Sequence, residues 1–148
     1  HKNQEQEIKK FKTISDKSMH GNAIVDLQGN ILYINDYFAK AHGYTVNELI
    51  GKNLAIFHSE KQLPVAIEIN KELIENGSYS VKEIWHVHKD GTEFPMLMSG
   101  VLHHDLDGKP NFLSASAIDI SKQKEANKQI RLLSQVVKTT SQSVVIAD

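Results

Sequence analysis

The chain has 148 residues, 40% of them apolar and 24% charged, which suits one modest domain with flanking segments. Its 17 basic and 18 acidic residues nearly cancel, so charge gives no argument for a nucleic-acid or anionic-membrane partner. No apolar run approaches the roughly 18 residues of a membrane span, and no signal peptide opens the sequence. We therefore expect a cytoplasmic chain with no direct membrane insertion.

Cysteine is absent from the sequence. This excludes disulfide bridges, thiolate catalysis, thiolate-bound zinc and c-type haem attachment.

The N-terminal segment, residues 1–18, is predicted to form an amphipathic helix. Ile8, Phe11 and Ile14 recur in it at three-residue spacing and share one helical face. The next segment is predicted to be a β-hairpin. Two apolar runs in it flank a turn that contains Asp26 and Gly29.

Capping signals then predict three helices before the next strand. The first is capped by Asn35 or Asp36 and runs to Ala41. The second is capped by Thr45, with Glu48 completing a capping box, and is stopped by Gly51. The third begins near Pro64 and ends before Gly77. Three strands follow, at Ser80–His88, Glu93–His103 and Asn111–Ile120. Because both connecting turns carry Asp-Gly, we expect consecutive hairpins. The pattern predicts an α+β domain with a five-stranded antiparallel sheet and helices on one face.

The last predicted helix, residues 121–138, carries a heptad-like seam. Ala126, Ile130, Leu133 and Val137 are spaced by four, three and four residues. A seam of about two heptads is too short to dimerise alone, but it can extend a dimer held elsewhere. Residues 133–148 match residues 11–26, which end with the first strand of the hairpin, when the chain is shifted by 122 positions, so we expect a second, similar module to begin within residues 139–148.

Taken in order, these landmarks resemble the PAS family over roughly positions 10 to 122. They are AIVDLQGNILYIN, AHGYTVNELIGKN, FHSE, KDGTEFP, DLDGKP and the closing DIS at Asp119–Ser121. The resemblance implies a PAS domain over residues 19–120, a possible ligand cavity between sheet and helices, and a signalling helix after the domain.

The sequence lacks the residues that several cofactors and catalytic reactions require. Light-oxygen-voltage flavin adducts need a cysteine, and the helix that carries the haem histidine in some PAS proteins has no histidine here. We expect no thiol-adduct flavin and no haem, while noncovalent flavin stays open. His86 and His88 with His103 or His104 lack a further metal ligand, so no metal site is predicted. No phosphate-binding loop or nucleophile elbow is present, so we expect no enzyme.

Strand alternation and the resemblance together predict the residues that line the cavity. The candidates are Tyr33, Asn35, Ile67, Leu73, Ile84, His86, Met96 and Met98. Gly100 shares their face, and with the methionines it would leave a roomy, deformable lining in which His86 is the polar anchor. The alternative is a filled core in which His86 is a satisfied core histidine.

The opposite phase of the strands carries Trp85, Leu97 and Val101. An apolar patch on the outer sheet face usually marks a contact surface. We expect the N-terminal helix to cover it through Ile8, Phe11 and Ile14, within a homodimer.

At the end of the last strand, the resemblance implies that Asp119 and Ser121 couple the sheet to the signalling helix. The simpler role for either residue is a helix cap, and the two roles are compatible.

The sequence therefore predicts a signal-sensing or signal-relay module of a multidomain protein, such as a sensor histidine kinase or a cyclic-dinucleotide signalling protein. The output domain would lie elsewhere in the full-length chain. The alternative is a structural dimerisation spacer without a ligand. The sequence does not identify a cofactor or ligand.

Overall fold

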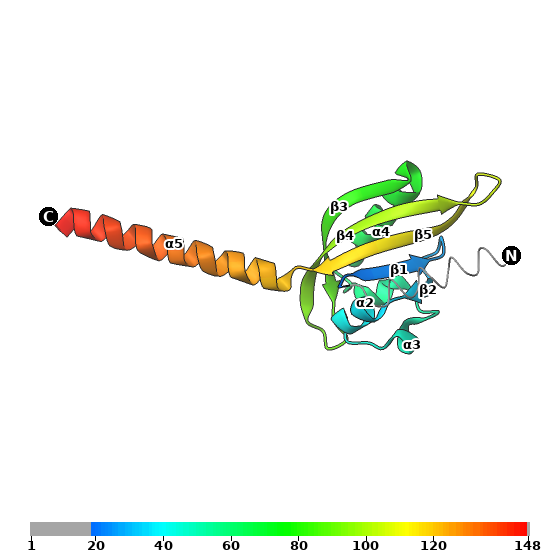
Figure 1. The fold of residues 1–148 in the computed structure, drawn as a ribbon, viewed down its shortest axis with the longest axis horizontal. Helices are drawn as coiled ribbons and strands as arrows, with labels where there is room; N and C mark the ends of the chain where they lie inside the picture. The colour runs from blue at the N-terminus through cyan, green and yellow to red at the C-terminus, as the bar shows by residue number, and fades with distance from the viewer. Residues whose placement is uncertain (1–18, 148) are drawn as a thin grey trace.

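The computed structural model describes residues 19–147, with side chains through Thr139. Its centre is one five-stranded antiparallel sheet with the strand order β2-β1-β5-β4-β3 (Figure 1). The strands are β1 (Gly21–Val25), β2 (Ile31–Ile34), β3 (Ser78–Val87), β4 (Glu93–His104) and β5 (Pro110–Asp119). The predicted fold class is confirmed, and the strand bounds differ by at most two residues from those expected for the last three strands.

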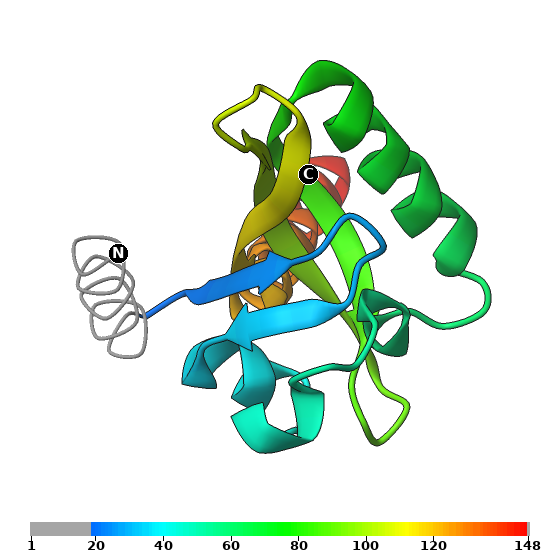
Figure 2. The same cartoon turned by 90° about the vertical axis from the view of Figure 1, so that its right-hand side faces the viewer.

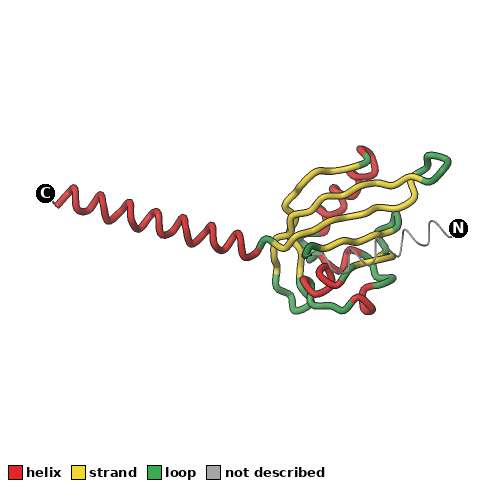
Figure 3. Tube along the Cα trace, in the orientation of Figure 1, coloured by secondary structure: helices red, strands yellow, loops and turns green. Residues whose placement is uncertain are grey.

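The short helices and the longest domain helix lie together on one face of this sheet (Figure 2). They are α2 (Asp36–Ala41), α3 (Val46–Leu49), the 3-10 helix η1 (Leu54–Phe57) and α4 (Leu63–Asn76). The last helix, α5 (Ser121–Ala147), leaves the end of β5 and projects away from the domain (Figures 1 and 3).

Local sequence signals place α2, α3 and α4 as predicted. The side chain of Asn35 caps α2 by accepting a hydrogen bond from the Phe38 backbone N–H. Thr45 and Glu48 form the expected capping box of α3. Gly77 ends α4 in the left-handed region, at φ 84°, where a residue without Cβ is least strained.

The two faces of the sheet differ as strand alternation requires. On the inner face, Ile84, Met96 and Met98 are buried, together with Leu113 and Ala117 of β5. The predicted inward phase of β3 and β4 is therefore the one that packs under the helices. The β3–β4 register is irregular between Tyr79 and Lys82, so the alternation of inward and outward side chains shifts at the start of β3.

Two predictions concern segments at the ends of the chain. The N-terminal helix and its residues Ile8, Phe11 and Ile14 lie outside the described residues. At the other end, α5 runs to Ala147 rather than stopping near 138. The start of a second module in residues 139–148 stays a prediction.

Candidate functional site

A cavity of about 180 Å³ lies between the inner face of the sheet and the helices. Its walls are mostly apolar and come from β1, α2, η1, α4, β3, β4 and β5. Among the apolar residues that line it are Val25, Phe38, Leu54, Phe57, Ile69 and Leu113. Typical pockets for drug-sized ligands measure roughly 300–1,000 Å³, so this cavity suits a smaller molecule.

Five of the eight predicted pocket residues line this cavity. They are Ile67, Leu73, Ile84, His86 and Met98. Ile67 is 64% exposed whereas His86 is 2% exposed, so the lining extends from solvent at α4 to the core at β3.

The other three predicted pocket residues lie elsewhere. Tyr33 pairs with Ile24 across β1 and β2, on the face opposite the buried Ala23 and Val25. Asn35 is fully buried, but as a structural cap that bonds to the backbone. Met96 is fully buried opposite Asp119 in the β4–β5 register and is not among the residues that line the cavity.

The expected roominess beside Gly100 is also absent. A Cβ atom built on Gly100 would lie 2.5 Å from Cε1 of Tyr79 and 3.2 Å from a methyl of Leu73. The glycine therefore lets the Tyr79 ring pack directly on the β4 backbone, so its space is filled rather than open.

A buried cluster of histidines forms the polar part of the lining. His42, at the end of α2, and His86, in β3, are both buried, and Nε2 of His42 lies 2.7 Å from Nδ1 of His86. Nδ1 of His42 lies 2.8 Å from the Phe38 carbonyl oxygen. The ring of His58 meets that of His86 edge-on, with ring centroids 4.7 Å apart. Both His58 and His86 line the cavity.

Burial keeps these three imidazoles neutral. Desolvation lowers the pKa of His42 to about 4, partly offset by its hydrogen bond to the Phe38 carbonyl. Desolvation, with the nearby His42 and His58, lowers the pKa of His86 well below its usual value. Desolvation also lowers the pKa of His58, against a hydrogen bond to the Trp85 backbone carbonyl. At neutral pH each ring therefore carries one N–H donor and one lone-pair acceptor.

On the outer face, Trp85 and Val101 are 44% and 45% exposed, and Leu97 is partly exposed. These residues form the apolar outer face that strand alternation predicts. Within the described residues, Trp85 and Pro95 lie beside the first turns of α5 in a shallow groove. Contact of this face with the N-terminal helix stays a prediction, because that helix lies outside the described residues.

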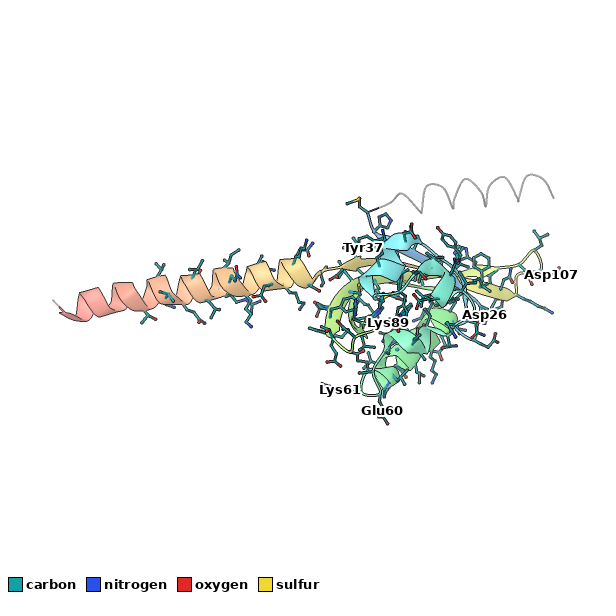
Figure 4. All side chains as sticks on the ribbon, turned by 90° about the horizontal axis from the view of Figure 1, so that it is seen from below. Asp26, Tyr37, Glu60, Lys61, Lys89 and Asp107 are labelled. Atoms are coloured by element: carbon teal, nitrogen blue, oxygen red, sulfur yellow. The ribbon has the colours of Figure 1, made fainter. Side chains whose placement is uncertain are left out.

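The predicted coupling residues lie at the junction of β5 and α5. Oδ1 of Asp119 accepts hydrogen bonds from both the backbone N–H and the hydroxyl of Ser121. The backbone N–H of Asp119 donates to the Tyr37 hydroxyl oxygen of α2 at 3.2 Å. Figure 4 shows Tyr37 on the side of the domain from which α5 leaves, with Asp26 and Asp107 at the opposite end.

Sequence reasoning missed His42, Phe57 and Tyr37. His42 meets His86 across a separation of 44 residues, and no local pattern indicates such a pairing. The 3-10 helix η1, which carries the fully buried Phe57, was not predicted either. Among the described residues, no group of three or more histidine and carboxylate side chains could hold a metal ion.

Comparison with known proteins agrees with this geometry. A family model described as a PAS domain matches residues 20–122, and the chain belongs to the PAS domain family. PAS domains are sensory modules and are generally non-catalytic, so the chain is a sensory domain.

The curated relatives are much longer proteins, and the match covers a small part of their length. Phototropin-1A and phototropin-1B of Oryza sativa subsp. japonica are each 29% identical over 98 residues, 66% of this chain but 11% of each phototropin. The chain thus spans about a tenth of these relatives.

Solved structures share the fold. A PAS domain from Colwellia psychrerythraea superposes with a TM-score of 0.71 at 22% identity, covering 78% of this chain and 98% of that one. A PAS domain from a two-component sensor histidine kinase gives a TM-score of 0.65 at 17% identity, with the same coverages. The Rhodobacter sphaeroides LOV protein gives a TM-score of 0.66 at 15% identity, over 78% of this chain and 68% of that one.

Within residues 19–147, no helix combines the length and apolar character needed to cross a bilayer.

Proposed function

We propose that this chain is a signal-sensing module of a larger signalling protein. A small molecule binds in the cavity, and the change passes through α2 to the root of α5. The observation that carries the proposal is a series of polar contacts that leads from the cavity lining to the first residue of α5.

The first part of this series joins the cavity to α2. His86 lines the cavity and bonds through Nδ1 to Nε2 of His42, whose Nδ1 bonds to the Phe38 carbonyl. Since Phe38 belongs to α2, a shift of the His86 ring acts on this helix through fixed hydrogen bonds rather than through loose packing.

The second part joins α2 to α5. Tyr37 precedes Phe38 in α2, and its hydroxyl accepts the Asp119 N–H. Asp119 in turn holds the N–H and hydroxyl of Ser121. A rotation of α2 therefore changes the position of the strand end from which α5 departs. Such a change would shift the equilibrium between two orientations of α5.

The size and chemistry of the cavity support a small ligand. A flavin is a drug-sized molecule, and about 180 Å³ is below the usual range for such ligands. The absence of cysteine also removes thiol-adduct photochemistry. One structural relative, a PAS domain of a LuxR-family regulator from Burkholderia thailandensis, was solved in complex with ethanol, a ligand of the small size that fits here.

The exposed side of α5 supports a homodimer in the full-length protein. Ile130, Leu133 and Val137 are between 61% and 65% exposed and follow the predicted seam. We propose that a second copy covers them as a short coiled coil that leads to an output domain, as in a sensor histidine kinase. The second candidate function is a dimerisation spacer, which this apolar stripe would serve without any ligand.

Native mass spectrometry with an absorption spectrum of the freshly purified chain tests the sensing function. We expect a dimer whose mass exceeds two chains by that of a small bound molecule, with no flavin or haem band. A dimer of unmodified mass that stays unchanged after incubation with a fragment library would support the spacer instead. Binding to unfolded chain is excluded by repeating the spectrum at denaturing pH, where the added mass should disappear.

The coupling route makes its own prediction. Replacing His86 by Phe should shift the backbone amide resonances of Ser121–Lys124, because the change reaches α5 through His42, α2 and Tyr37. In the presence of Tyr37→Phe, which removes the acceptor of the Asp119 N–H, this shift should fall by at least about half.

The matched control for that cycle is Tyr44→Phe. Tyr44 is a partly buried tyrosine whose ring packs near Phe57, and it takes no part in the route. An equal His86→Phe shift at α5 with and without Tyr37→Phe would show that coupling runs through the sheet instead.

A further inference from the structure

Hydrogen bonds fix the proton positions in the histidine cluster. A carbonyl oxygen only accepts, so the 2.8 Å contact with Phe38 places the proton of His42 on Nδ1. Because that ring is neutral, its Nε2 carries a lone pair and must accept from Nδ1 of His86. His86 is then protonated on Nδ1, and its Nε2 is a lone-pair acceptor.

This acceptor has no partner among the described residues. Nε2 of His86 is buried and receives no hydrogen bond, and the same holds for Nδ1 of His58. The ring of His58 lies edge-on to that of His86, with ring centroids 4.7 Å apart. Buried polar atoms are nearly always hydrogen-bonded in folded proteins, so two such atoms in neighbouring rings point to a ligand or solvent donor.

Both rings line the same cavity, and the rest of its wall restricts what can bind there. The described lining contains no Asp, Glu, Lys or Arg, so a buried charge of either sign would lack a partner. The other polar side chains, including Gln28 and Asn70, are less buried than His86. The buried end therefore offers the lone pair of His86 Nε2 and aromatic faces, and the N–H of His86 is already used in its bond to His42.

We propose that the cavity selects a small uncharged molecule that donates an N–H or O–H hydrogen bond to Nε2 of His86. This inference rests on the proposed sensing function and names the class of its ligand: neutral alcohols, amides or N–H heteroaromatics of a few heavy atoms. Carboxylates and other anions are excluded, since they would set acceptor against acceptor without a counter-charge. Purely apolar molecules leave the Nε2 lone pair unsatisfied and bind more weakly.

Pyrrole and furan test this selectivity. The two rings have the same size and shape, but pyrrole presents an N–H donor where furan presents an oxygen acceptor. Titrations of the chain are followed by the methyl resonances of Ile84 and Met98, which line the cavity. The side-chain ¹⁵N resonance of His86 Nε2 reports directly on an accepted hydrogen bond.

We expect pyrrole to bind at least about tenfold more tightly than furan, and to move the His86 Nε2 resonance. The preference should shrink to less than about threefold in His86→Phe, which removes this acceptor. His58→Leu, which removes a neighbouring lining ring but leaves the His86–His42 pair and the Nε2 acceptor intact, should keep a preference above about threefold and controls for general disruption of the cavity. His104→Gln, at an exposed position of β4, should leave the preference unchanged.

The outcomes separate this inference from the function on which it rests. Equal binding, or tighter binding of furan, would overturn the donor requirement while leaving the cavity as a ligand site. Shifts confined to residues outside the cavity, with Ile84 and Met98 unmoved up to the solubility limit of both probes, would overturn the sensing cavity and the donor requirement together.

Discussion

Lowering the pH from 7 to 5 is expected to reduce the free energy of unfolding by about 2 kcal/mol through His42 alone. Burial lowers the pKa of His42 from 6.5 to about 4 in the folded chain, so between these values the unfolded chain binds the proton and the folded chain does not. Stability is therefore fully present above about pH 6.5 and is lost as the pH falls toward 4. The lowered pKa values of His86 and His58 act in the same direction.

Urea unfolding at several pH values measures this dependence. The carboxylates with lowered pKa values, Asp26, Glu48 and Asp90, titrate from unfolded values of 3.8 to 4.5, so their contribution lies mostly below pH 5. The loss of unfolding free energy between pH 7 and 5 should be smaller in His42→Gln and unchanged in the exposed control His104→Gln. An imidazole titration by NMR that gave His42 a pKa above 6 would contradict the buried neutral pair.

Replacing Asn35 by Ala is expected to destabilise the domain by about 3 kcal/mol. The Asn35 side chain is fully buried and accepts from the backbone N–H groups of Asn22 and Phe38 while donating to the His20 carbonyl. Alanine would remove one buried and two part-buried hydrogen bonds, where a buried group left unsatisfied costs about 1–3 kcal/mol, and would also remove the cap of α2.

Chemical denaturation with a matched neighbour checks this value. Asp36→Asn changes the next residue, which is exposed in the first turn of α2, and should cost no more than about 1 kcal/mol through the helix dipole. A loss below 1 kcal/mol for Asn35→Ala would mean that water replaces the side chain at little cost, and that the α2 cap is not a structural requirement.

The fold was predictable because its signals are local. The capping box of Thr45 and Glu48, the left-handed Gly77 and the Asp-Gly turns are each specified within a few residues. The inward phase of β3 and β4 followed from alternation over long strands. Consequently the predicted element types and five-stranded antiparallel sheet agree with the structure, and errors are confined to the ends of elements and to the short η1.

The site was predictable only in part, because its polar contacts are not local. Asn35 has the side chain of a pocket anchor, yet its position before α2 makes it a cap. Ile84 and Met98 were found by alternation, but the meeting of His86 with His42 and His58 depends on how η1 and α2 fold over the sheet. Strand alternation indicates His86 as a single polar anchor, whereas in the structure its ring lies against those of His42 and His58.

The place from which α5 departs has a mechanical consequence. β5 is the central strand of the sheet, hydrogen-bonded to β1 on one side and β4 on the other, so the root of α5 is anchored in the stiffest part of the domain. A straight helix of 27 residues is about 40 Å long. Tilting it by about 5° at this root moves its far end by about 3.5 Å. The helix is thus a lever arm: displacements at Asp119 too small to disturb the sheet become movements as wide as a side chain at its tip.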